Sequence, residues 1–207
     1  MSSKKIVSLV IASSLLFSAF ALPVQAKSDE SLIKPPVFLT GQLSKQLSKD
    51  MEGVHQFFRE NNYGIEDSMN ELAELKSSED SLGLTHIKTQ QMVKDIPVFG
   101  NEYIIHFNQN GEVYCMNGKY DANAKNAKIN KERFIGENIA IEIARSKVIF
   151  DDYCSAVNSK LYLRNINDEY VPIYVVSLSF VFPERGYWHF YINAEDGTII
   201  KQIQHKC

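Results

Sequence analysis

Catalytic signatures are missing from this 207-residue sequence. None of its five histidines is followed by glutamate, because the next residues are Gln56, Ile87, Phe107, Phe190 and Lys206. This excludes the H-E-x-x-H motif, in which two histidines one helical turn apart bind zinc and the glutamate is the base. The sharp G-x-S-x-G turn of serine hydrolases is missing as well. We therefore expect a chain that is not an enzyme and has no cofactor.

Cysteine is also scarce. Cys115, Cys154 and Cys207 are far apart and form no C-x-x-C pair, so the pattern does not support a zinc or redox motif. We interpret Cys115 and Cys154 as small apolar side chains and Cys207 as a free thiol. Export would permit a disulfide, but the sequence leaves its pairing open. A nucleophilic cysteine–histidine pair has no local signature either, and its members would be Cys115 or Cys154 with His86, His106 or His189.

An excess of positive charge is absent too. The formal net charge is −3, and no basic stripe runs along the chain. Proteins that bind nucleic acid concentrate lysine and arginine on one face or along one helix. We therefore expect no nucleic-acid partner.

The first residues have the pattern of a secretory signal peptide. Lys4 and Lys5 precede an apolar run at residues 6–22, Pro23 ends the run, and small residues follow up to Ala26. This pattern predicts export and cleavage after Ala26. A membrane anchor is the alternative, but the run is shorter than the ~20 apolar residues that a membrane span needs. We expect a secreted protein without a stable membrane anchor.

Beyond the signal peptide, the chain shows one plan twice. A leader at residues 27–42 precedes a first unit at residues 43–124, and a second unit follows at residues 125–207. Each unit begins with a helical pattern and continues with strand patterns. This order predicts an α+β fold of two small units, each with a helix packed on an antiparallel sheet.

In the first unit, apolar residues at helical spacing predict a helix that starts near Thr40 and stops near Gly64. Its apolar face comprises Leu43, Leu47, Met51, Val54 and Phe58. A short acidic helix is expected at residues 67–75 and a polar loop at residues 76–81. The expected strands are residues 84–91, 96–100, 102–107 and 112–116. Between the last two, Asn110-Gly111 supplies the positive φ angles of a hairpin turn.

In the second unit, residues 121–128 are expected to be a linker, and a helix capped by Asn130 is expected at residues 131–149. Strands are predicted at residues 160–164, 170–182, 187–193 and 198–204, with turns at 165–169 and 183–186. Large apolar side chains alternate on two of these strands. We interpret this face as core under the helix rather than as a ligand platform, and its residues are Tyr174, Val176, Leu178, Phe180, Phe182, Trp188, Phe190 and Ile192.

A run of motifs in the first unit resembles the fungalysin/thermolysin propeptide motif. Members of that family carry a G-x-T-H-x-x-x-x-Q stretch, a P-V-F-G stretch, a strand ending in histidine and an N-G pair. Here the matching residues lie in the same order between Gly83 and Gly118. The structural motif residues that the resemblance implies are Gly83, Thr85, His86, Gln90, Pro97, Val98, Phe99, Gly100, His106, Gly111, Asn117 and Gly118.

Residues 131–203 resemble the PepSY domain that follows this motif in the family. The helix with Ala140 and Ala144 and the closing residues 191–200 match its pattern. Asn193 stands where the family usually has aspartate, which keeps a turn-forming side chain but loses the charge. The resemblance implies cystatin-like or PepSY-like units. It also implies that His86 and His106 are structural and hold strand to strand, with a two-histidine metal site as the alternative.

The two resemblances together point to the propeptide of a secreted thermolysin-type (M4 family) metalloprotease. The chain is then expected to stop where the protease of the family would begin. This implies a stand-alone or truncated propeptide that inhibits a thermolysin-like zinc metalloprotease, assists its folding, or does both. The inhibitory tail would be Ile203, Gln204, His205, Lys206 and Cys207, with the carboxylate, His205 or Cys207 facing the zinc. A solvent-exposed tail is the simpler alternative.

Two other functions stay open from the sequence. The chain could be a remnant of a truncated protease precursor with no function of its own. It could also be a secreted PepSY-type module that binds a peptide or an envelope component without any protease, because PepSY-like units occur in unrelated proteins. Neither alternative requires a catalytic site in this chain.

Overall fold

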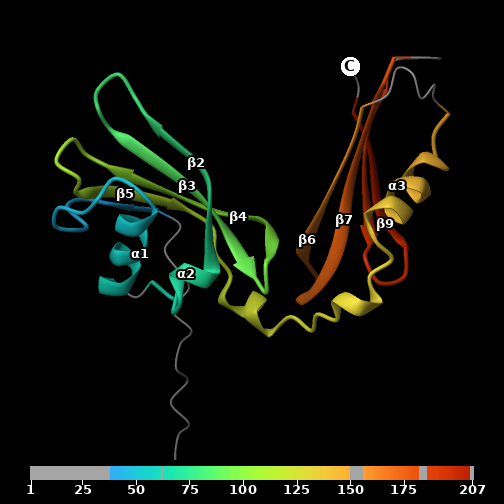
Figure 1. Ribbon diagram of the computed structural model, residues 1–207, viewed down its shortest axis with the longest axis horizontal. Coiled ribbons are helices and arrows are strands. Elements are labelled where there is room, and N and C mark those ends of the chain that lie inside the picture. The colour runs from blue at the N-terminus through green and yellow to red at the C-terminus, as the bar shows by residue number, and fades with distance from the viewer. Residues whose placement is uncertain (1–37, 62, 150–155, 182–185, 206–207) are drawn as a thin grey trace, which may run out of the picture. The chain divides into compact units, whose positions relative to one another are not determined.

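The computed structural model describes residues 38–61, 63–149, 156–181 and 186–205 (Figure 1). Its helices are α1 (Met51–Glu60), α2 (Ser68–Glu71) and α3 (Glu137–Arg145), with 3₁₀-helices η1 (Ala122–Asn126) and η2 (Lys131–Arg133). The strands are β1 (Phe38–Thr40), β2 (Leu72–Glu79), β3 (Thr85–Val93), β4 (Ile96–Phe107), β5 (Val113–Gly118), β6 (Ala156–Ile166), β7 (Glu169–Phe180), β8 (Gly186–Asn193) and β9 (Ile199–His205). The fold is mixed α/β and mostly sheet. The predictions that lie outside the described residues concern the signal peptide, Cys154, Phe182, the turn at 183–185, Lys206 and Cys207.

Helix α1 starts later than the apolar spacing predicts. Its N-cap is Asp50, whose side chain accepts a hydrogen bond from the Gly53 amide at 3.1 Å. The predicted start near Thr40 is wrong, because Thr40 belongs to β1, which pairs with β5. The chain between β1 and α1 also bonds to the β4–β5 hairpin, with Leu43 N donating to Val113 O at 2.8 Å. Leu43 and Leu47 still contact the core. The spacing therefore identified residues that pack against the core but predicted the wrong backbone conformation for them.

The acidic segment after α1 is a strand rather than a helix and a loop. Only Ser68–Glu71 is helical, and β2 runs antiparallel to β3 from Leu72 to Glu79. The predicted helix at 67–75 and loop at 76–81 are therefore wrong for most of their length. The ladder with β3 satisfies the backbone groups of a segment whose side chains face solvent from Glu74 onward, so no apolar period marks it.

Strands β3, β4 and β5 form the motif-bearing hairpins. The two strands expected at residues 96–100 and 102–107 are one strand, β4. Lys94 and Asp95 make the β3–β4 turn with φ angles of 49° and 66°. In the β4–β5 turn Gly111 has a φ of 82°, while Asn110 is not among the residues with positive φ. The expectation that both residues of that pair adopt positive φ is therefore wrong.

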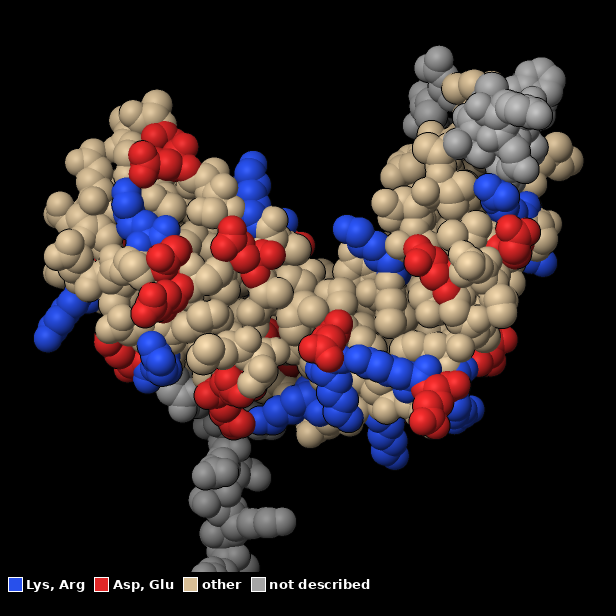
Figure 2. Space-filling view, in the orientation of Figure 1, with Lys and Arg blue, Asp and Glu red and all other residues tan. Residues whose placement is uncertain are grey.

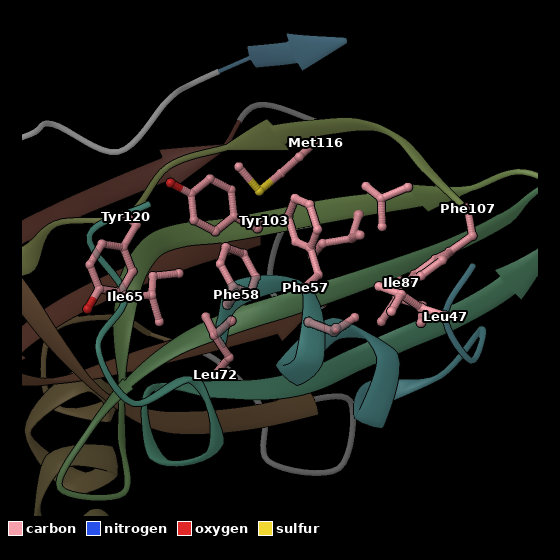
Figure 3. Packing of buried hydrophobic residues seen from close by; sticks show 13 residues of the cluster. Leu47, Phe57, Phe58, Ile65, Leu72, Ile87, Tyr103, Phe107, Met116 and Tyr120 are labelled. Carbon is pink, nitrogen blue, oxygen red and sulfur yellow. The ribbon is translucent and has the colours of Figure 1, made fainter. Parts of the chain in front are cut away.

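The first hydrophobic core lies between α1 and this sheet. Figure 3 shows Phe57 and Phe58 of α1 pointing toward Tyr103 and Met116 on the strands. All four side chains are at most 2% exposed. Burying a side chain of this size contributes about 1.5–3 kcal/mol, so α1 is held by packing rather than by its own helix propensity.

The expected linker is packed into the fold. Ala124 in η1 and Ala127 after it are buried in a cluster with Val98 of β4 and Leu163 of β6. The second helix is shorter than predicted, since α3 starts after Gly136, whose φ is 88°. Asn130 does cap a helix, but that helix is η2, where its side chain accepts from Glu132 N.

Strands β6 to β9 form an antiparallel meander that carries α3 on one face (Figure 1). Ala140 and Ala144 of α3 pack on this face, and the aromatic side chains of β7 and β8 lie beneath the helix. The interpretation of the alternating aromatic face as core is thus confirmed for its described members. The predicted turn between β6 and β7 is present, with positive φ at Asn167 and Asp168. Within the described residues, no helix is long and apolar enough to cross a membrane.

The two sets of strands are connected through β4. Its first part pairs with β6 in parallel, with Val98 opposite Leu163, and its second part pairs with β3 and β5. The strands therefore belong to one nine-stranded sheet, which the sequence did not predict. Basic and acidic side chains are interspersed on the face shown in Figure 2. Several form exposed pairs, such as Lys88 with Glu102 at 2.6 Å.

Candidate functional site

The two motif histidines lie directly opposite each other on β3 and β4. His86 pairs with His106, and their Nδ1 atoms are 2.7 Å apart. His86 Nε2 lies 3.3 Å from Asp80 Oδ2, and His106 Nε2 lies 2.8 Å from Asn117 Oδ1. The structure therefore joins three of the predicted motif residues and one, Asp80, that the sequence analysis did not single out.

Both outer nitrogens of the pair face oxygen atoms, Asp80 Oδ2 for His86 and Asn117 Oδ1 for His106, so the two rings and these two neighbours form one chain of polar contacts. Hydrogen bonds from the Leu84 amide first, and then from His86, hold the pKa of the Asp80 carboxyl below its usual value.

This chain of contacts ties the β2–β3 turn to β5 across two strands. The direct contact between the two Nδ1 atoms uses the nitrogens that a shared metal ion would need. Among the residues that the structure describes, no group of three or more histidine, cysteine, aspartate or glutamate side chains could hold a metal ion. The geometry is that of a polar network that links neighbouring strands.

Two motif glycines stand where a side chain would collide with backbone. Gly118 has a φ of 143°, and a Cβ there would lie 2.0 Å from Glu102 O. Gly111 lies against the segment before α1, where a Cβ would be 2.4 Å from Leu47 O. Of the other motif residues, Gly83 lies in the β2–β3 turn and Thr85 is buried at the start of β3. In this chain, Gly111 and Gly118 therefore permit a close approach of two backbone segments.

Gln90 bonds to β4 beside the Pro97–Gly100 motif. Its Nε2 donates to Val98 O and to Asn101 O, each at 2.8 Å, and the side chain is buried. The β3–β4 register shifts at this point, between Gln90 and Met92. The amide of Gln90 therefore bonds to β4 carbonyls at the point where the β3–β4 ladder is interrupted.

The neighbouring Gln91 extends this polar network from β3 to Asp121, and through Asp121 to β7. Its Oε1 accepts from Asn101 Nδ2 at 2.8 Å and from Asp121 N at 3.0 Å, and its Nε2 donates to Asp121 O at 2.9 Å. The Asp121 carboxylate in turn accepts from the Tyr170 hydroxyl of β7. Burial, with Asp121 beside it, raises the pKa of Tyr170 to about 12.

The Pro97–Gly100 motif also reaches β6 and β8. Val98 is buried in the shared cluster, and Phe99 turns its ring edge-on to Tyr162 and Tyr191, with centroids 5.4 and 5.7 Å away. The Arg164 guanidinium lies over the rings of Phe99 and Tyr191, at 5.4 and 4.6 Å from their centroids. The motif therefore contributes a second set of contacts between the two sets of strands, besides the Gln91–Asp121–Tyr170 network.

The described part of the expected inhibitory tail is a β-strand. Ile203, Gln204 and His205 belong to β9, opposite His189, Trp188 and Tyr187 of β8. Within the described chain, β9 is the last strand of the sheet and pairs only with β8. His205 Nε2 is 2.9 Å from His189 Nδ1, and Tyr187 Oη is 3.0 Å from His189 Nε2. Burial first, and then the neighbouring His205, lowers the pKa of His189.

Several residues of these networks escaped the sequence analysis. Asp80, Gln91, Asn101 and Asp121 are polar residues in or beside expected strands, and nothing local distinguishes them from solvated ones. Arg164 had a detectable signal, because polar side chains alternate along β6. The residues on that face are Asn158, Lys160, Tyr162 and Arg164.

Two family models match the chain. Residues 70–120 match the Fungalysin/Thermolysin Propeptide Motif, and residues 139–203 match the PepSY model, described as "Peptidase propeptide and YPEB domain". Both modules occur in the predicted order, which confirms the resemblance read from the motifs. The first match includes the histidine pair, Gln90 and Gln91, and the second includes most of α3 and strands β6 to β8.

Curated relatives match across most of the chain. Bacillolysin of Bacillus subtilis (strain 168) is 26% identical over 215 residues, which cover 96% of this chain and 40% of that protein. Neutral protease B of the same organism is 31% identical over 126 residues, 58% of this chain and 23% of that protein. Thermolysin of Alicyclobacillus acidocaldarius subsp. acidocaldarius is 26% identical, with coverage of 91% and 37%. The chain thus spans two fifths or less of the length of these relatives.

Among solved structures, the C-terminal domain of Bacillus megaterium YpeB matches with a TM-score of 0.39 and 15% identity. The match covers 83% of this chain and 73% of that one.

Proposed function

Because the chain carries a fungalysin/thermolysin propeptide motif followed by a PepSY domain, we propose that it inhibits a thermolysin-like zinc metalloprotease and assists its folding. The observation that carries this proposal is the paired order of the two modules, shared over nearly the whole chain with proteins named bacillolysin and thermolysin. The protein partner is the protease, and this chain supplies no catalytic group.

The sheet offers a physical route to inhibition. An exposed edge strand can add to a sheet or an extended groove of a partner through main-chain hydrogen bonds, while alternate side chains occupy pockets. Strand β9 is such an edge among the described residues, and Ile203, Gln204 and His205 lie at its end. We propose that this end and the two residues after it occupy the substrate groove as a segment that binds without being turned over.

The proposal also includes export. The residues before the described part have the pattern of a signal peptide with cleavage after Ala26. Export would place the chain in the same compartment as a secreted protease. The corresponding check is the N-terminal sequence of the chain recovered from culture medium, which should begin at Lys27.

Inhibition is tested with the purified chain from residue 27 onward and thermolysin. Micromolar chain should slow hydrolysis of a chromogenic peptide in a saturable manner. Ile203→Asp should weaken inhibition by about tenfold or more, since it places a carboxylate where an apolar contact is expected. Leu82→Asp is the matched control, because Leu82 is 66% exposed in the β2–β3 turn.

Two results would count against this function. One is an unchanged rate of peptide hydrolysis when the chain is present at micromolar concentration and circular dichroism shows that it is folded. The other is equal inhibition by Ile203→Asp and the parent chain, which would remove β9 from the interface. Assisted folding is tested separately, by diluting denatured thermolysin with and without the chain. The regained activity, measured after dilution below the inhibitory range, should rise with the chain present.

A further inference from the structure

The face of the β6–β9 meander opposite α3 carries a groove. Its volume is about 300 Å³, and α3 covers only the other face of this sheet. The lining residues come from β6, β7 and β8, with Phe99 of β4 at one end, and they are Phe99, Asn158, Lys160, Tyr162, Val175, Ser177, His189 and Tyr191. A volume at the low end of the range for ligand sites suits a group of about one or two amino-acid residues.

Arg164 adjoins this groove through its contacts with the lining residues Phe99 and Tyr191, and it has no polar partner among the described residues. It follows Tyr162 on the same face of β6, and the rings of Phe99 and Tyr191 hold its guanidinium. Its Nη1 atom is buried and has no hydrogen-bond partner in the described structure. A guanidinium fixed by two rings loses little side-chain entropy when it binds a carboxylate through its fork of N–H donors.

The surrounding charge has one sign. Lys160 lines the groove, and Lys201 of β9 lies opposite Tyr191 in the register. Neither lysine forms an ion pair among the described residues, and no aspartate or glutamate lines the groove. Glu169, the acidic residue of β7, lies at the β6–β7 turn and lines a different pocket. Unpaired cations without a local counter-ion attract an anionic ligand.

The residues that line the groove favour a peptide carboxylate over a bare inorganic anion. Tyr162 and the mostly buried Tyr191 line the groove with aromatic rings, and Asn158, Ser177 and His189 supply polar groups farther along it. A bare inorganic anion would use only the cations, whereas a peptide would use the rings and the polar groups as well. We propose that this groove binds a short peptide through a carboxylate, which pairs with Arg164 and Lys160 while the adjoining residue stacks on Tyr162 and Tyr191.

The carboxylate can come from a peptide C-terminus or from an acidic side chain, and a set of peptides separates the two sources. Isothermal titration uses Ac-Ala-Tyr with a free C-terminus, Ac-Ala-Tyr-Glu-amide and the neutral Ac-Ala-Tyr-Gln-amide. At least one of the two acidic peptides should bind at least tenfold more tightly than the neutral one and more tightly than inorganic phosphate. Equal binding of the neutral peptide, or tighter binding of phosphate, would overturn the proposal.

Variants connect the binding to the named residues. Arg164→Met keeps an apolar stem against the rings and should weaken the better acidic peptide about tenfold or more, as expected for one charge-assisted hydrogen bond. Lys160→Met is the second test, because Lys160 is exposed and its loss should not prevent folding. Lys147→Met, at an exposed position just after α3, is the control and should leave binding unchanged.

The variant results also separate this groove from the protease proposal. Unaltered peptide affinity in both Arg164→Met and Lys160→Met would refute the groove, with circular dichroism confirming that each variant is folded. Inhibition of thermolysin depends on β9 in the proposed function and is measured independently. A chain that inhibits thermolysin but binds none of the acidic peptides would retain the first proposal and reject this one.

Discussion

Replacing Gln91 tests whether its hydrogen bonds connect the two sets of strands and stabilise the fold. Gln91→Leu keeps a similar volume but removes the amide, so it deletes the contacts with Asn101 Nδ2, Asp121 N and Asp121 O. Gln91 is 2% exposed, so water has little access to the groups left behind. Each intramolecular hydrogen bond is worth about 1 kcal/mol net, and an abandoned buried group costs about 1–3 kcal/mol. We expect a loss of about 3 kcal/mol in the free energy of unfolding.

Urea denaturation measures this loss with two signals. Trp188 is the only tryptophan in the chain and packs with the core beneath α3, so its fluorescence reports the β6–β9 meander. Circular dichroism reports the whole sheet. Because Asp121 leads on to Tyr170 of β7, the substitution in β3 should lower the Trp188 transition as well.

The control for this substitution is Gln109→Leu. Gln109 is exposed and makes one side-chain hydrogen bond, to Leu82 O at 2.7 Å, so its replacement should change stability by less than about 1 kcal/mol. The reasoning is refuted if Gln91→Leu costs no more than Gln109→Leu. It is also refuted if the circular dichroism transition shifts while the Trp188 transition stays in place.

Three further predictions concern single positions. Asp50→Ala should cost about 1 kcal/mol of stability by thermal unfolding, as for a lost N-cap, while Asp67→Ala should cost less because Asp67 makes no side-chain cap bond to α2. Gly118→Ala should cost more than about 3 kcal/mol in urea titration, since its Cβ would meet Glu102 O and backbone must move. The folded pKa of His189 lies below its ordinary 6.5, so its contribution to stability is present above pH 6.5 and is lost as pH falls from 6.5 to the folded value. His189→Gln should therefore make stability less dependent on pH between pH 7 and 5, and an unchanged slope would contradict this.

The sequence predicted the buried positions better than the backbone that carries them. Leu47 is buried in the core and Leu43 packs against it, as the spacing indicated, yet both lie in non-helical chain bonded to the β4–β5 hairpin. That tertiary pairing outweighs local helix propensity, and no local pattern encodes it. The strand β2 escaped prediction for the same reason, since its side chains from Glu74 onward face solvent and only its pairing with β3 makes it a strand.

The motif predicted which residues matter but not how they connect. His86 and His106 were expected to join strands, and the structure places them in direct contact. Their outer partner Asp80 is 6 residues before His86, in a turn that no alternation marks. The Gln91–Asp121 contact spans 30 residues, so only the folded chain brings these groups together. Arg164 was within reach of sequence reasoning, because it continues the polar face of β6 opposite the predicted core.

Strand β4 belongs to both sets of strands, and this affects which fragments of the chain can fold separately. Because β4 pairs with β3 and β5 and also, at Val98, with β6, a cut in the chain near residue 125 would separate strands that pair in the intact chain. The first fragment would keep β4 with Val98 and Phe99 uncovered, a short apolar edge of the kind that promotes aggregation. The second would lose the strand beside β6. Because each fragment would expose apolar surface that the other covers in the intact chain, the two fragments should reassociate when mixed rather than behave as independent modules.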